Sequence, residues 1–187
     1  MKQYYLIKRK VLGLPVGVDL AEHYVKQMAD KDSWFLTPLG QAITTLSHLK
    51  LDSYGEIRGL KSKVSKQGDK YYCIESKQYQ MPNGDNTKYE VLKKINSEDH
   101  VYEIRIKLRS LHGYDSHCRI FITINVDTPY FIWSYGFTKQ ENIFLYAGMS
   151  ANRLTDVLST VTHRVYRGIN SDKESEYVGK AGERHEV

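Results

Sequence analysis

Two stretches of the chain decide the fold, VYEIRIKLR at 101–109 and RIFITINV at 119–126. In both, large apolar side chains occupy every second position, which is typical of a β-strand with two different faces. A third stretch, YFIWSYGF at 130–137, follows the turn Asp127-Thr128-Pro129. The three stretches predict an antiparallel β-meander with an apolar face packed on helices and a polar face exposed to solvent.

The residues before the meander predict a strand and a helical hairpin. Residues 3–9 read as a first strand, and apolar side chains at helical spacing predict a helix over 19–29. A second helix is predicted over 37–49, with Thr37 as its N-cap and Pro38 at the first helical position. The two helices would cover the apolar face of the meander.

A β-hairpin is predicted between the helices and the meander. Residues 71–74 and 89–92 have the composition of strands, and the step Asn83-Gly84 between them favours a tight turn. We interpret residues 66–97 as an insertion that carries this hairpin.

The C-terminal part predicts one more helix and then a tail. Apolar side chains at helical spacing place the helix at about 150–161, and residues 164–187 are polar and balanced in charge. We therefore expect a single α+β domain over 1–163 and a flexible tail over 164–187. The expected order is N-terminal strand, helical hairpin, inserted β-hairpin, β-meander and C-terminal helix.

Composition favours an intracellular protein that folds without cross-links. The chain has 187 residues and only two cysteines, Cys73 and Cys118, which we expect to be reduced thiols. No apolar run has the length needed to span a membrane, and the N-terminus turns basic too early for a signal peptide. We therefore expect a cytoplasmic protein with no membrane partner and no cofactor.

Positive charge is concentrated in the first half of the chain. The formal net charge is +5, and residues 1–95 hold 16 basic and 10 acidic side chains. Five cations, Arg58, Lys61, Lys63, Lys66 and Lys70, form the densest group, and the first four are candidate contacts for RNA phosphates. The competing interpretation is a solvated loop.

The polar face of the meander carries a second group of cations. Alternation places Arg105, Lys107 and Arg109 on one strand and Arg119 on the next, all on the same face. Arginine matches the oxygens of a phosphate with two parallel donors, so Arg105 and Arg119 are candidates to grip one phosphate. The alternative is a pair of exposed cations without a ligand.

The loop between these strands contains groups that can move protons. His112 and His117 lie in the segment LHGYDSHC at 111–118, together with a tyrosine and an aspartate. A plain hairpin turn accounts for the same residues, and their spacing matches no closed zinc site, so we predict no metal. After the last strand, Lys139 can add charge to a phosphate site, and Tyr135 can stack on a base.

Three short motifs lie along the predicted meander, one for each of its strands. The chain has Tyr102-Glu103-Ile104-Arg105, then Cys118-Arg119-Ile120, and then Tyr135-Gly136-Phe137-Thr138-Lys139 at the end of an apolar strand. These motifs, with the order of the predicted elements, resemble the RelE/HigB superfamily of toxin ribonucleases, in particular its phage-type members. The resemblance implies a RelE-like fold, with residues 66–97 and the C-terminal extension as additions. It also implies an endoribonuclease held by an antitoxin and acting on mRNA, on or off the ribosome.

For such an enzyme the candidate catalytic residues are Arg105, Arg119, His112, His117 and Lys139. Metal-free RNA cleavage needs groups that accept the 2′-hydroxyl proton, stabilise the phosphate and protonate the leaving oxygen. The arginines suit the second task, and the loop histidines suit the other two.

Two further functions fit the same sequence. The first is a protein from a phage or other mobile element that binds a host nucleoprotein or its guide RNA without cleavage, in the manner of an anti-CRISPR inhibitor. Its affinity would fall with salt. The second is a small-molecule-binding protein whose aromatic strand lines a pocket.

Overall fold

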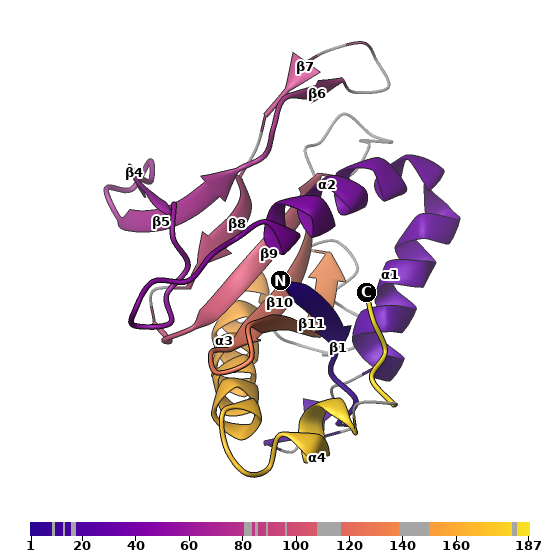
Figure 1. The fold of residues 1–187 in the computed structure, drawn as a ribbon. Helices are drawn as coiled ribbons and strands as arrows, with labels where there is room; N and C mark the ends of the chain where they lie inside the picture. The colour runs from indigo at the N-terminus through magenta and orange to yellow at the C-terminus, as the bar shows by residue number, and fades with distance from the viewer. Residues whose placement is uncertain are drawn as a thin grey trace.

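The computed structural model describes residues 1–8, 10–12, 14–15, 18–80, 84, 86–88, 90–95, 97–107, 117–138, 150–180 and 183–187. It is an α+β fold, as predicted (Figure 1). In chain order the elements are β1 (Lys2–Tyr5), β2 (Lys10–Val11), β3 (Leu14–Pro15), α1 (Val18–Lys31), a 3-10 turn (Ser33–Phe35), α2 (Leu36–Ser47), β4 (Lys61–Val64), β5 (Lys70–Glu75), β6 (Tyr79–Gln80), β7 (Asn86–Thr87), β8 (Glu90–Lys94), β9 (Val101–Lys107), β10 (His117–Asn125), β11 (Tyr130–Thr138), α3 (Ala151–Ile169) and α4 (Ser175–Val178).

One seven-stranded sheet organises the molecule, in the order β1-β11-β10-β9-β8-β5-β4. All neighbouring strands are antiparallel except β1, which pairs with β11 in parallel. The predicted meander β9-β10-β11 is confirmed, and so is the predicted pairing of β5 with β8. We call residues 58–94 the wing, because their strands extend the sheet to one side and the short β6–β7 arm projects beyond it (Figure 1).

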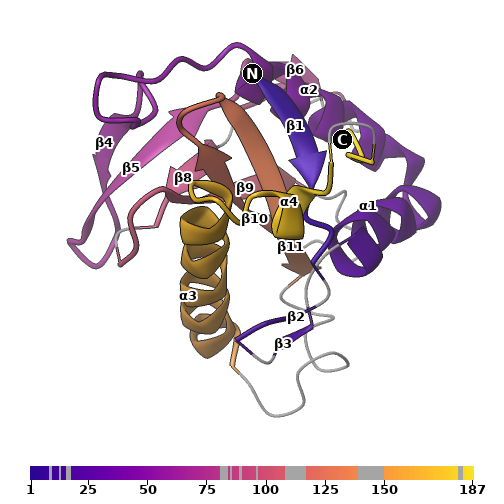
Figure 2. The same ribbon diagram turned by 60° about the horizontal axis from the view of Figure 1, so that its bottom comes forward.

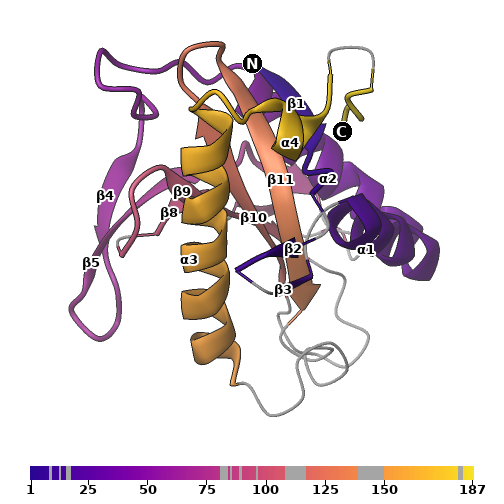
Figure 3. The same cartoon turned by 90° about the horizontal axis from the view of Figure 1, so that it is seen from below.

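Helices lie on both faces of the central strands (Figures 2 and 3). On one face, α1 and α2 cover a core that includes Ile104, Ile122 and Trp133. On the opposite face, α3 covers a second core that includes Phe121 and Ile132. The prediction of one apolar and one solvent-exposed face was therefore wrong for β10 and β11, whose side chains are buried on both sides.

A β-bulge in β11 explains how both faces become apolar. Phe121 pairs with Tyr135, but the next residue, Ile122, pairs with Trp133, so Ser134 is the extra residue. The extra residue changes which face the side chains point to. Trp133 therefore packs under α1 and α2, whereas Tyr135 packs under α3. Simple alternation along the strand predicts these two aromatic side chains on the same face.

The end of the chain is structured where a flexible tail was expected. Helix α3 continues to Ile169, and α4 buries Tyr177 and Val178 against the second core. The last residues lie along β1, where the Tyr5 amide donates to the His185 carbonyl at 3.0 Å. The free edge of β1 explains this order, because its unpaired backbone groups need partners.

The second helix begins differently from its prediction. Asp32 caps the 3-10 turn by accepting a hydrogen bond from the Trp34 amide at 3.1 Å, and α2 starts directly after this turn at Leu36. Thr37 is consequently inside the helix and is not its N-cap. Among the described residues, no helix is both long and apolar enough to cross a membrane.

Gly136 is a point where α1 and β11 approach closely, and it gives a test of the fold. A Cβ added at this residue would lie 2.4 Å from Cδ1 of the buried Tyr24 ring. We expect Gly136→Ala to lower the free energy of unfolding by about 1–3 kcal/mol, because the core must shift to admit the methyl group. Urea unfolding followed by circular dichroism measures this. Gly40→Ala is the matched control.

Gly40 lies in α2, and a Cβ there meets no atom within 4 Å. Its replacement by alanine should raise stability by about 0.5–1 kcal/mol, because alanine favours the helix. Equal stability of the two variants would contradict the close packing of α1 on β11.

Candidate functional site

The two arginines singled out by sequence face one another across neighbouring strands. Arg119 of β10 is the direct cross-strand partner of Arg105 of β9, so both side chains lie on the face that α3 partly covers. The prediction that the two arginines are neighbours on one face of the sheet is confirmed. Their expected exposure is wrong, since only 15% of the Arg119 side chain and 22% of the Arg105 side chain is accessible. Burial lowers the pKa of Arg119, an effect that Glu103 opposes and Arg105 reinforces.

Glu103 holds this pair together from the same strand as Arg105. Its side chain is 2% exposed, and its Oε1 lies 2.9 Å from Nε of Arg105 and 3.4 Å from Nε of Arg119. The first contact is a hydrogen bond, whereas Nε of Arg119 is buried and lacks a hydrogen-bond partner. One carboxylate thus shares its charge between two guanidinium groups, and one donor remains unused.

The wing continues this network through Glu90 of β8. Glu90 accepts a hydrogen bond from the Tyr71 hydroxyl at 2.6 Å and lies 3.4 Å from both Arg105 and Lys63. Burial alone would raise the pKa of Glu90. The hydrogen bond from Tyr71 and the charges of Arg105 and Lys63 outweigh burial, so the pKa is lowered and the carboxylate is ionised at neutral pH.

Lys63 lies on the edge strand β4 and extends this network to the edge of the sheet. Its ammonium group donates to Glu75 at 2.7 Å, and this hydrogen bond is the main reason that the pKa of Lys63 is raised. Lys93 completes the cluster, with its Nζ 4.8 Å from the centre of the Tyr71 ring. Burial, reinforced by the charge of Arg105, lowers the pKa of Lys93.

We call this set the charged cluster. Its members are Lys63, Tyr71, Glu75, Glu90, Lys93, Glu103, Arg105 and Arg119. Four cations face three carboxylates, so the cluster is far less positive than the cations in the sequence predict. An RNA phosphate that binds the arginines must therefore compete with the glutamates.

The remaining predicted residues divide into three groups. Arg58, Lys61 and Lys66 are exposed on the wing, as a phosphate-contacting surface requires. Tyr135 is 1% exposed, so its predicted role in base stacking is wrong, because the bulge in β11 turns its ring into the second core.

The third group falls wholly or partly outside the described residues. His112, Arg109 and Lys139 lie outside them. Lys107 and His117 belong to β9 and β10 by their backbones, and their side chains are not among those described.

Sequence reasoning missed the two carboxylates of the site. Glu103 was detectable, because residues two apart on a strand share a face and Glu103 precedes Arg105 by two. Glu90 was not detectable from the sequence, because its position beside Arg105 depends on the pairing of β8 with β9. Within the described ranges, no group of three His, Cys, Asp or Glu side chains is placed to hold a metal ion.

No protein-family model, curated protein or solved structure shows a significant match to this chain.

Proposed function

We propose that this protein binds RNA and cleaves it without a metal, as an endoribonuclease of the RelE-like kind. The observation that carries the proposal is the half-buried pair Arg105 and Arg119, which face one another on adjacent strands. Two guanidinium groups at one point of a sheet offer parallel donors to a pentacoordinate phosphate. Partial burial strengthens their attraction to an anion.

In the proposed reaction the 2′-oxygen attacks the neighbouring phosphorus and the bond to the 5′-oxygen breaks, which leaves a cyclic phosphate. Glu90 is the proposed acceptor of the 2′-hydroxyl proton, because its side chain is 20% exposed, ionised and 3.4 Å from Arg105. Glu103 is too buried to reach a substrate, so we assign it to positioning the arginines. His112 or His117 would protonate the leaving oxygen.

The test is induced expression in bacteria, with growth and RNA integrity followed together. We expect growth arrest and RNA loss with the wild type and neither with Arg105→Ala/Arg119→Ala. Because that variant leaves Glu103 without partners, Arg119→Lys is included. Lysine keeps the charge and loses the two-pronged grip, so RNA cleavage by purified, folded Arg119→Lys should fall about 100-fold or more. Wild-type rates in a folded Arg119→Lys protein would contradict the proposal.

One observation favours a second candidate, an RNA- or nucleoprotein-binding protein without catalysis. The arginines are engaged by glutamates, whereas Arg58, Lys61 and Lys66 are exposed on the wing. Such a protein would capture a host nucleoprotein or its guide RNA through the wing. Intact RNA in cells that express the wild type, together with salt-dependent RNA binding by the purified protein, would select this candidate.

A further inference from the structure

The wing contains a pocket that lies outside the charged cluster's arginine pair. It has a volume of about 370 Å³, and it opens where β5 ends and the chain leads into the β6–β7 arm. The side chains that matter for its chemistry are Lys61, Lys77, Lys88, Glu75, Gln78 and Ile74. Sites for small ligands begin at about 300 Å³, so the pocket can admit a group as large as one nucleotide unit.

The charge balance of the pocket favours an anion. Within the described part of the chain, neither Lys61 nor Lys77 forms an ion pair, and both are exposed. The single acid, Glu75, is already engaged by Lys63 at 2.7 Å and by Lys88 at 3.5 Å. The hydrogen bond from Lys63 lowers the pKa of Glu75, so this carboxylate stays ionised and bound to its partners.

The lining points to a phosphate and sugar more than to a base. Ile74 is the one large apolar side chain among the described residues of the lining, and none of them is aromatic. An unpaired base is usually held by stacking on an aromatic side chain, and the described lining offers none. The two lysines and the amide group of Gln78 offer donors for phosphate and hydroxyl oxygens.

A chain of ion pairs connects the pocket with the arginine pair. Glu75, at the pocket, contacts Lys63, which contacts Glu90, and Glu90 contacts Arg105. From β5 to β10 the sheet runs over three strand spacings, which is about 14 Å. A single RNA strand that crosses the sheet can therefore reach both places.

We propose that this pocket binds a phosphodiester group of the RNA strand whose cleaved phosphate lies at Arg105 and Arg119. The inference rests on the proposed function and extends it, because it gives the wing a defined role. The pocket would hold single-stranded RNA a few nucleotides away from the cleavage position. Substrates long enough to cover both sites would then bind more tightly than substrates that reach only the arginines.

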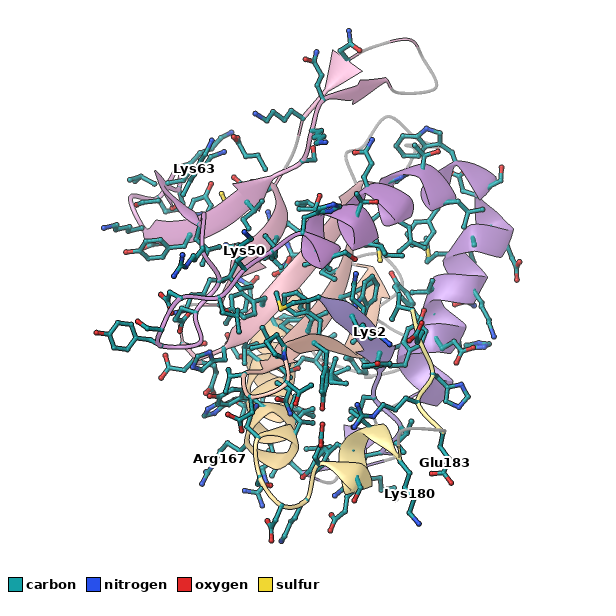
Figure 4. The ribbon with its side chains drawn as sticks, in the orientation of Figure 1. Lys2, Lys50, Lys63, Arg167, Lys180 and Glu183 are labelled. Carbon is teal, nitrogen blue, oxygen red and sulfur yellow. The ribbon has the colours of Figure 1, made fainter. Side chains whose placement is uncertain are left out.

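The test measures binding of non-cleavable 2′-O-methyl RNA by fluorescence anisotropy, with a 12-mer and a 3-mer, in a salt series. We expect Lys61→Gln/Lys77→Gln to weaken binding of the 12-mer at least 10-fold and to reduce its salt slope by about 0.7, because one phosphate contact is lost. Binding of the 3-mer should stay unchanged. The matched control is Arg167→Gln/Lys180→Gln, which removes two exposed cations at the opposite end of the molecule from Lys63 (Figure 4).

Four results would overturn the inference, and they are distinguishable. Equal losses with the control variant mean a general charge effect and no pocket. Normal 12-mer binding by Lys61→Gln/Lys77→Gln would reject the role of the pocket alone. A wild-type protein that binds neither RNA would reject the proposed function as well. A titration with inorganic phosphate is the last arm. Free phosphate that binds as tightly as the 12-mer would assign the pocket to a free anion.

Discussion

Replacement of Glu103 by glutamine is expected to lower the free energy of unfolding by about 3 kcal/mol. The carboxylate is 2% exposed and is shared by Arg105 and Arg119, so its loss leaves two half-buried cations side by side without a counter-charge. Removing one partner of a buried ion pair commonly costs about 3–5 kcal/mol, and the amide of glutamine retains part of the hydrogen bonding. Urea unfolding at pH 7 measures the change.

Glu75→Gln is the matched control for that prediction. It makes the same substitution in the same network, but at a more exposed pair with Lys63, where solvent screens the interaction. Its unfolding midpoint should stay close to that of the wild type. A similar loss of stability in both variants would show that Glu103 has no special place in the network.

The same substitution separates binding from catalysis. If RNA phosphate binds the arginines as proposed, it must displace Glu103 from them, so Glu103→Gln should bind non-cleavable RNA several-fold more tightly than the wild type. It should also cleave RNA more slowly, since the guanidinium groups lose the carboxylate that orients them. Weaker binding together with unchanged cleavage would contradict the assigned role of Glu103.

The meander was predictable because its signal is local. Alternation in VYEIRIKLR and RIFITINV depends on the period of a strand and on nothing distant in the chain, and the structure confirms both strands and their pairing. The helices over 19–29 and 150–161 were predictable for the same reason, although α3 extends further, to Ile169.

The environment of the site was not predictable, because it depends on distant pairings. The bulge at Ser134 reverses the direction of Tyr135 relative to Trp133, and no feature of the strand's own sequence marks it. Likewise, the neutralisation of Arg105 by Glu90 requires the register of β8 against β9, two strands separated by a turn. The sequence correctly predicted that the arginines are neighbours. The glutamates that neutralise them could be identified only from the structure.

Ending the chain at Asn170 is expected to lower the free energy of unfolding by about 4 kcal/mol. The truncation removes Tyr177 and Val178, and burial of one such side chain contributes about 1.5–3 kcal/mol before the cost of ordering the segment. It also removes the hydrogen bonds from Tyr5 to His185 and from Ile7 to Tyr177.

A shorter truncation, after Gly179, keeps α4 and its buried side chains, and should therefore lose clearly less stability than truncation after Asn170. Both truncations uncover the edge of β1, so we expect them to self-associate in size-exclusion chromatography. Wild-type stability in both would mean that the C-terminal segment contributes nothing to the fold. Because β1 and β4 lie at opposite edges of the sheet, any folded truncated protein should keep the RNA affinity that we propose for the wing. The C-terminal segment would then act on stability alone, and RNA binding would belong to the other side of the sheet.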